Sequence, residues 1–351
     1  MMIAESIIDI SHGFFDEVVK PVLERECPDE MGQMVFGVFG YGSEALGLDD
    51  QYSRDHHWGL RINALMPEDL FQARREAVQQ AVSSNLPRTY RGHALREGYT
   101  GIGLELDSLE GFLTRTVGLT HAPRTYAEWL SVPEEDIVHV INGQVWHDPA
   151  GQFTSIRQVF SRYYPEPVRL RRIAHWCRYF SGMGTYALKR AILRENELYE
   201  VTTFARAIKL GVQLAFLLDR RYFPYDKWLY AYFERLPRMS SRLKPIVDEA
   251  VKLSTPWERK LELLDQMSDV LDGALVEDGI IAPHPKFTGS ATSGYRLMEN
   301  AYAEILKKLP DETKTVVPVV DQIYWERFHS GYVSDLDLDT WRGLLNLRPV
   351  R

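Results

Sequence analysis

The sequence predicts an α+β protein, in which a small mixed sheet with flanking helices is followed by a C-terminal all-helical bundle. Two observations support this class. Before residue 152, short β-rich runs that end at glycines or polar turns alternate with helical patterns. From residue 155 onward, the pattern is almost purely helical and is punctuated by prolines. We therefore divide the chain into an α/β head, residues 1–151, and a helical body, residues 152–351.

The elements of the head follow from hydrophobic periodicity and end signals. Pro67 suits the first turn of a helix, and Glu68 and Asp69 favour the positive end of that helix. Strands are expected at 33–39, 55–65, 101–107 and 144–148. Helices are expected at 4–26, 42–46, 67–84, 109–117, 125–130 and 133–141.

The body is expected to consist of helices, and the β-branched run 315–324 fits either a strand or an extended loop. The expected helices span 155–164, 168–183, 184–219, 225–236, 240–253, 256–277 and 294–306.

Composition narrows the class of protein. The chain has 351 residues, of which 45% are hydrophobic and 26% charged, as in ordinary globular proteins. The net charge of −8 argues against a nucleic-acid partner, because surfaces that bind nucleic acid need clustered excess Lys and Arg. The two cysteines form neither a metal-type pair nor a disulfide framework. No signal peptide and no 18-residue apolar run is recognisable, so we expect a cytoplasmic protein with no membrane segment.

The most informative motif is a glycine-rich turn, residues 40–47, that follows the first predicted strand. A Gly-Ser turn lets backbone N–H groups and a small hydroxyl approach a phosphate closely, and Gly42 and Ser43 fit that role. Asp55 follows a few residues later and opens the next predicted strand. A phosphate-holding turn followed by a metal-binding acid is the outline of a nucleotidyl-transfer site.

A metal site of this kind needs further ligands close to Asp55. Residues at i and i+2 of a strand point to the same face, which pairs Asp55 with His57. A third acid from a neighbouring strand completes the set, and either Glu105 or Asp107 is suited to it. Carboxylates that alternate along a strand in this way are also typical of a solvated face.

His57 leaves three interpretations open. In the first interpretation, His57 is a metal ligand and the site has an altered metal preference, because imidazole suits Mn²⁺ better than Mg²⁺. In the second, His57 is a general base for the acceptor hydroxyl, a role that suits its near-neutral pKa. Or it marks a degenerate metal site in a fold that only binds a nucleotide.

These residues resemble a bacterial family of unknown function within the nucleotidyltransferase superfamily, which includes polymerase-β-like and kanamycin-type enzymes. The resemblance covers roughly residues 30–240. Its first part lies in Gly42-Ser43-Glu44, Ser53-Arg54-Asp55-His56 and Trp58-Gly59. Its later part lies in Trp129-Leu130, Gly143, Val145, Asp148, Arg157, Tyr163-Tyr164-Pro165, Phe223-Pro224-Tyr225 and Lys227-Trp228-Leu229.

The resemblance implies a nucleotidyltransferase-like head with an Asp-x-Asp or Asp-x-His site at Asp55 and His57. It also implies a helical bundle over the nucleotide, in which Tyr225 and Lys227 face the phosphates. Arg54, inside the motif, joins the nucleotide-binding residues. Further candidates for phosphate contact are Arg157 and the arginine run 169–172, although a run of charge usually forms a solvated face.

The expected function is therefore transfer of a nucleoside monophosphate from a nucleoside triphosphate to a hydroxyl or amine of a small-molecule acceptor. A divalent metal, Mg²⁺ or Mn²⁺, is expected at Asp55, His57 and Glu105. The alternative is a non-catalytic nucleotide-binding or regulatory module whose metal site is degenerate at His57. A third possibility is a toxin-type enzyme that modifies RNA or protein.

Overall fold

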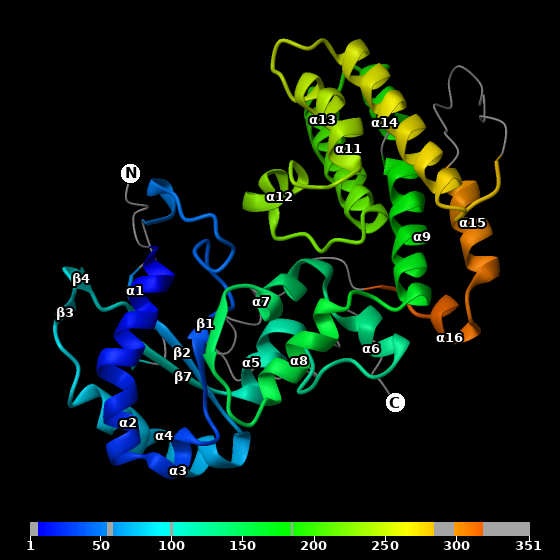
Figure 1. Ribbon diagram of the computed structural model, residues 1–351. Helices are drawn as coiled ribbons and strands as arrows, with labels where there is room; N and C mark the ends of the chain where they lie inside the picture. The colour runs from blue at the N-terminus through cyan, green and yellow to red at the C-terminus, as the bar shows by residue number, and fades with distance from the viewer. Residues whose placement is uncertain (1–5, 55–58, 99–100, 184, 284–297, 319–351) are drawn as a thin grey trace. The chain divides into compact units, whose positions relative to one another are not determined.

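The computed structural model describes residues 6–54, 59–98, 101–183, 185–283 and 298–318. These residues form two compact units (Figure 1). The head unit comprises residues 6–123 and 136–162, and the helical unit comprises residues 124–135 and 163–318, within the described ranges. The head contains a small sheet with helices and the other unit is helical, which confirms the predicted α+β class.

The head is built on a four-stranded mixed sheet in the order β7-β2-β1-β8. The central strand β1, Val35–Val38, runs antiparallel to β2, Ile62–Met66, and to the edge strand β8, Gln144–His147. The other edge strand, β7, Leu104–Ser108, runs parallel to β2. The predicted edge strand at 144–148 is thus confirmed.

One face of the sheet carries the main hydrophobic core of the head. The long N-terminal helix consists of α1, Ile7–Phe14, a π-helical turn, Phe15–Val19, and α2, Lys20–Glu26. It packs on this face together with α4, Glu68–Ser83 (Figure 1). Ser6 caps α1 through a reciprocal capping box with Asp9, which explains why the helix starts there.

The opposite face of the sheet is covered by α5, Leu109–Val117, α7, Ile137–Ile141, and α8, Gln152–Ser161. Three aromatic rings fill the space behind β1. The ring centroid of Phe39 lies 5.4 Å from that of Phe112 and 4.7 Å from that of Phe153. Asn63 of β2 and Glu105 of β7, which alternate with core residues, point to this second face.

The head also contains short elements that the sequence analysis did not predict. They are α3, Pro28–Met31, the 3₁₀ turn η2, Gln51–Arg54, and the two-residue strands β3, Thr89–Tyr90, β4, His93–Ala94, β5, Glu97–Gly98, and β6, Gly101–Ile102. Strands this short carry too little periodicity to be recognised. The predicted strand 101–107 is divided at Gly103, whose φ is +69°.

Two further predictions for the head differ from the structure. The predicted helix 42–46 is a single turn, because positive φ values at Gly42 and Gly47 stop the helical repeat at both ends. The predicted strand 55–65 begins later, at Ile62, and residues 55–58 lie outside the described ranges.

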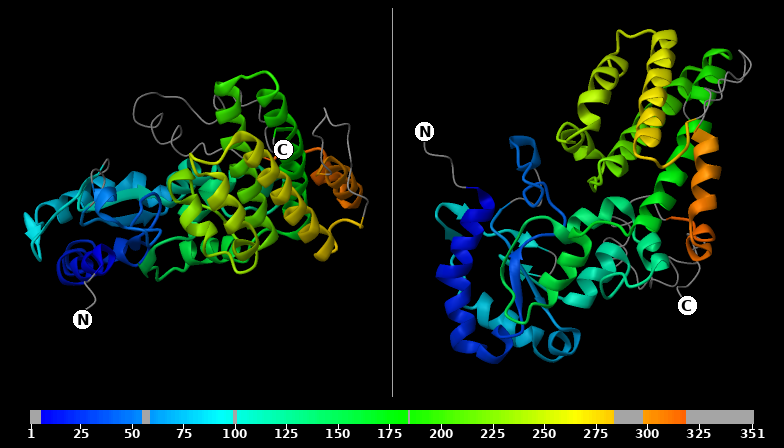
Figure 2. Two further views of the ribbon diagram at one scale, coloured as in Figure 1. Left: turned by 90° about the horizontal axis from the view of Figure 1, so that it is seen from above. Right: turned by 45° about the vertical axis from the view of Figure 1, so that its right-hand side comes forward.

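The helical unit consists of α-helices joined by short turns, and α15 lies alongside α9 (Figures 1 and 2). Its helices are α6, Tyr126–Ser131, α9, Glu166–Met183, α10, Thr185–Ile192, α11, Glu197–Leu218, α12, Asp226–Phe233, α13, Met239–Ala250, α14, Trp257–Glu277, α15, Met298–Lys308, and α16, Asp311–Lys314.

The predicted single helix 184–219 is wrong, because the chain breaks between α10 and α11. Glu195 has a φ of +53°, and the side chain of Asn196 accepts a hydrogen bond from Tyr199 N at 3.1 Å. Asn196 therefore starts a new helix as its N-cap. Of the run 315–324, residues 315–318 form no strand, and residues 319–324 lie outside the described ranges.

A buried ion pair fixes the segment 124–135 within the helical unit. Arg172 is fully buried and its Nη1 lies 2.9 Å from Glu134 Oε1, while its Nη2 donates to the carbonyls of Trp129 and Val132 at 2.9 and 2.6 Å. Trp176 Nε1 donates to the same carboxylate at 3.0 Å. The solvated face expected for the arginine run is therefore wrong, since these arginines are 0–5% exposed.

Helix α11 is long and apolar enough to cross a membrane, with a mean hydropathy of 1.4 over its most apolar window. However, 67% of that window is buried inside the helical unit. Gln213, in the middle of the helix, also bonds to the buried Glu135 at 3.3 Å. These are the features of the core helix of a globular protein.

The contact between β1 and β8 predicts a strong effect of substituting Gly37. A Cβ atom there would lie 2.1 Å from Gln144 O, so Gly37→Ala must displace β8, and we expect a loss of about 3 kcal/mol of unfolding free energy. Urea denaturation measures it. The matched control is Gly32→Ala, where φ is −66° and the nearest atom lies 3.7 Å away, so stability is expected to be retained. Equal midpoints for the two variants would contradict the close approach of the strands.

Candidate functional site

The candidate site is built around the glycine-rich turn that follows β1. Gly40 and Gly42 have φ values of +83° and +146°, which L-residues rarely adopt. A Cβ atom at position 42 would also lie 2.6 Å from the carboxylate oxygens of Glu44. Ser43 is 8% exposed, and its carbonyl accepts hydrogen bonds from Leu46 N and Leu48 N, which closes the turn. The turn thus requires glycine where the sequence has it.

Buried amide side chains hold the start of this turn in place. Phe39 N donates to Asn63 Oδ1 at 3.1 Å. Gly40 N donates to Asn142 Oδ1 at 3.0 Å, and Asn142 Nδ2 donates to Gly40 O at 2.7 Å. This reciprocal pair fixes the peptide groups of Gly40 on both sides.

His139 adds a second donor to the same carbonyl. Its Nδ1 lies 3.3 Å from Gly40 O, and its ring centroid lies 5.2 Å from that of Tyr41. Burial lowers the pKa of His139 to about 4, so the imidazole is neutral at physiological pH. A neutral ring that donates from Nδ1 makes His139 a positioning residue for the turn.

Arg157 holds the main chain at Ile141 and Asn142. Its Nη2 donates to Ile141 O at 2.7 Å and to Asn142 O at 2.8 Å. Sequence analysis had placed Arg157 among the candidates for phosphate contact, but its guanidinium instead binds the main chain of the segment that carries Asn142.

A cluster of two arginines and two glutamates lies next to the turn. Arg61 Nη2 lies 2.8 Å from Glu44 Oε1 and donates to Tyr41 O at 3.0 Å. Arg96 Nε lies 3.6 Å from Glu105 Oε1, and Arg61 Nη1 lies 3.8 Å from Glu105 Oε2. The arginine side chains are 4% and 9% exposed, so the four charges balance one another inside the head.

The two glutamates of this cluster are bound very differently. Glu44 has the short contact to Arg61, in the range of a charge-assisted hydrogen bond. The polar contacts of Glu105 are 3.3 Å to Asn63 Nδ2, 3.6 Å to Arg96 and 3.8 Å to Arg61. Its Oε1 accepts no hydrogen bond from the described part of the chain. Glu105 therefore retains an oxygen that can bind a further group.

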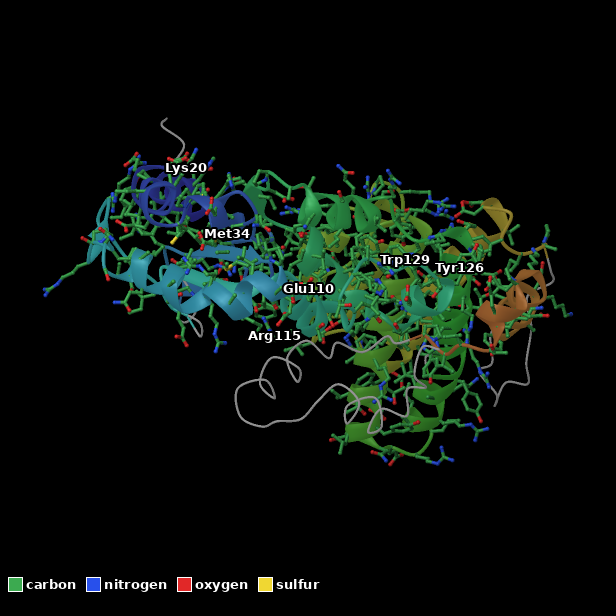
Figure 3. The ribbon with its side chains drawn as sticks, turned by 90° about the horizontal axis from the view of Figure 1, so that it is seen from below. Lys20, Met34, Glu110, Arg115, Tyr126 and Trp129 are labelled. Carbon is green, nitrogen blue, oxygen red and sulfur yellow. The ribbon has the colours of Figure 1, made fainter. Side chains whose placement is uncertain are left out.

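The structure separates Glu105 from Asp107, which the sequence left equivalent. Asp107 forms an ion pair with Arg115 of α5, labelled in Figure 3, and accepts a hydrogen bond from Ser108 N at 2.8 Å. Ser108 is the N-cap of α5. Asp107 thus supports a helix start, whereas Glu105 lies in the cluster beside the turn.

The segment that leads to Asp55 is ordered by a local cap. Asp50 Oδ1 accepts hydrogen bonds from Tyr52 N, Ser53 N and Ser53 Oγ at 2.9–3.0 Å. Asp55 and His57 lie outside the described residues, as does the side chain of Arg54. Among the residues that the structure describes, no group of three or more His, Cys, Asp or Glu side chains is arranged to hold a metal ion.

Tyr225 and Lys227, the nucleotide-binding candidates of the body, lie in the helical unit. Tyr225 is the N-cap of α12 and is 7% exposed. The Lys227 ammonium lies 5.0 Å from the centroid of the Trp228 ring, as in a cation–π contact.

Sequence analysis missed the buried carboxylate of Glu135 in the helical unit. Lys209 of α11 lies 3.1 Å from Glu135 and 2.6 Å from Asp226. Burial raises the pKa of Glu135 to about 7, although the charge of Lys209 acts in the opposite direction. Its sequence signal, a Glu-Glu-Asp run, is indistinguishable from a solvated helix start.

Comparison with known proteins identifies one family model, described as a domain of unknown function (DUF4037), which matches residues 129–229. The matched segment contains the supports of the turn, Asn142, His139 and Arg157, and the pair of Glu134 and Arg172. It ends just after Tyr225 and Lys227 and does not include the turn itself. No curated protein matches the chain.

The reciprocal bonds between Asn142 and Gly40 predict the effect of removing the amide. Asn142→Leu keeps the size of the side chain but leaves two buried main-chain groups without this partner, so we expect a loss of about 2 kcal/mol in unfolding free energy. Urea denaturation is the measurement. Asn85→Leu is the control, because the exposed Asn85 side chain donates to Ala81 O near the end of α4, and its cost is expected to stay below about 0.5 kcal/mol. Similar losses in both variants would remove the special role of Asn142.

Proposed function

We propose that the protein transfers a nucleoside monophosphate from a nucleoside triphosphate to a hydroxyl or amine of a small-molecule acceptor, with a divalent metal ion held by Asp55, His57 and Glu105. The observation that supports this most is the state of Glu105 beside the turn. Its side chain is 18% exposed, and one of its oxygens accepts no hydrogen bond from the described residues. Buried carboxylate oxygens normally have a partner, so a cation at this place fits the chemistry of the group.

In this proposal the turn holds the phosphates. Its backbone is fixed before any ligand arrives, because Asn63, His139 and Asn142 bind the main chain at its start. Gly42 and Ser43 would lie closest to the phosphate oxygens. Glu44 lies against Gly42, and its charge is neutralised by Arg61, which lowers its repulsion of an anion.

In this proposal the metal ion and the residues around it have different roles. A bound Mg²⁺ or Mn²⁺ ion supplies charge neutralisation on the phosphates and orients the attack. Glu105 is oriented by Asn63, which also binds Phe39 N, so the carboxylate and the turn are linked through one amide. His57 would act as ligand or base, and Arg54, Tyr225 and Lys227 would contact the nucleotide, as the resemblance to nucleotidyltransferases implies.

One observation favours a second candidate, a nucleotide-binding module without catalysis. Two guanidinium groups lie within 4 Å of Glu105, so that this carboxylate is already neutralised without a metal. With His57 in place of a second carboxylate, the site would then retain the phosphate turn and lack metal affinity.

Glu105 and Asp107 provide a matched pair of variants that test the proposed function. For the wild type, a nucleoside triphosphate with Mg²⁺ or Mn²⁺ at about 100 times its dissociation constant should add roughly 2.7 kcal/mol of stability. Glu105→Gln should abolish the metal-dependent part of this thermal shift, and Asp107→Asn should retain it, because Asp107 pairs with Arg115.

The four nucleoside triphosphates are screened with each metal, and release of pyrophosphate on mixed small acceptors is measured in parallel. If no nucleoside triphosphate shifts the melting temperature with any metal, both the transferase and the binding module are ruled out. A shift that does not depend on metal, together with no pyrophosphate release, would favour the binding module.

His57→Asp tests the role of the imidazole separately. If His57 is a metal ligand, the variant should use Mg²⁺ about tenfold better relative to Mn²⁺, because oxygen ligands suit Mg²⁺. If His57 is a general base, the variant should lose pyrophosphate release without a change in metal preference. An unaltered metal response in an active variant would show that the ligand assignment is wrong.

A further inference from the structure

A cationic pocket lies in the helical unit, on one face of α9. Arg171, His175, Arg178 and Tyr179 follow one another at helical spacing and face α15. With Tyr302 of α15 and Val317 they line a pocket of about 420 Å³. Its size lies in the range of pockets that bind small molecules.

The positive charge of this pocket has no counter-ion among the described residues. Arg171 is only 5% exposed, and its Nε and Nη1 donate no hydrogen bond to any residue that the structure describes. The neighbouring Arg172 shows the contrast, since it is paired with Glu134 and two carbonyls. The charged or titratable groups that act on Arg171 are Tyr302, Arg172 and Arg178, and no described carboxylate lines the pocket.

The other groups of the pocket are oriented by their own contacts. The Arg178 guanidinium lies 4.8 Å from the centroid of the Tyr302 ring. The ring of His175 stacks on that of Tyr179 at 4.4 Å and 28°. His175 is 7% exposed, and its Nε2, which is buried, has no hydrogen-bond partner. Arg178 and His175 are thus oriented by aromatic rings, and Arg171 and His175 carry nitrogen atoms with no hydrogen-bond partner among the described residues.

Burying a guanidinium without a partner is costly, and in folded proteins such a charge is normally paired. We propose that this pocket binds the oxyanion group of a small molecule, a phosphate or a carboxylate, between Arg171 and Arg178. The planar fork of arginine matches both groups, and two cations favour a dianion. The pocket belongs to the helical unit and shares no residue with the site proposed for nucleotidyl transfer.

His175 provides a spectroscopic reporter of the bound anion. Burial, together with the charges of Arg171, Arg172 and Arg178, lowers the pKa of His175 to about 4. An anion between the arginines offsets their field and stabilises the imidazolium, so the pKa of His175 should rise on binding.

The test is isothermal titration calorimetry of the full-length chain with inorganic phosphate, phenyl phosphate and succinate. Phosphate binding without succinate binding assigns a phosphate group, and the reverse assigns a carboxylate. Arg171→Met should weaken binding at least about tenfold, and Arg178→Gln should weaken it by several fold. Arg169→Met is the matched control on the same helix, because Arg169 is also buried but pairs with Glu166 at 3.6 Å outside the pocket; its affinity should stay within about twofold.

Two further readouts separate binding from a structural role. Without an anion, Arg171→Met should melt about 2 °C higher than the wild type, because it removes an uncompensated buried charge. Phosphate should raise the NMR-determined pKa of His175 in the wild type, and Arg178→Gln repeats the affinity test if Arg171→Met does not fold.

The outcomes are distinguishable from those for the proposed function. Anion binding should persist in Glu105→Gln, and the metal-dependent response to nucleoside triphosphates should persist in Arg171→Met. The proposal is overturned if none of the three anions binds the wild type at 10 mM or so, about the weakest specific affinity expected of such a site. It is equally overturned if Arg169→Met weakens binding as much as Arg171→Met does.

Discussion

The arrangement of the head depends on the hydrogen bonds between Asn142 and the peptide groups of Gly40. These bonds join the turn after β1 to the segment between α7 and β8, 102 positions later in the chain. Arg157 of α8 then holds Asn142 through main-chain carbonyls, and Gly143 N donates to Ala45 O at 2.8 Å. Residues from two helices, α7 and α8, and from the ends of strands β1 and β8 thereby fix the backbone of one short turn.

In the charge cluster beside the turn, the side chains of Glu44 and Glu105 differ in how closely the arginines contact them. Arg61 gives its short contact to Glu44, and Glu105 is left with contacts of 3.3 Å or more. A carboxylate held this loosely is stabilised by the nearby positive charge yet keeps an oxygen for another ligand. In the helical unit two arginines differ in the same way: Arg172 pairs with Glu134, whereas no carboxylate among the described residues pairs with Arg171.

Local signals were sufficient for much of the fold. Helix α5 was predicted at 109–117 and lies there, because Ser108 and Gly118 cap its two ends. The burial of the arginine run was not predictable, since Glu134 lies 38 positions before Arg172. The choice between Glu105 and Asp107 was also beyond the sequence, because alternation places both on one face and only their different partners in the folded chain separate them. Asp55 and His57 remain predictions.

The chain crosses between the two units more than once, and this affects which fragments of the protein can fold. The backbone enters the helical unit at residue 124, returns to the head at 136, and leaves it again at 163. A fragment that ends at 162 would therefore contain residues 124–135 without the helix that carries Arg172, and Glu134 would lose its buried partner. Such a fragment would carry a piece of the helical unit with an unpaired buried carboxylate, and during synthesis this piece can pack only after α9 has been made.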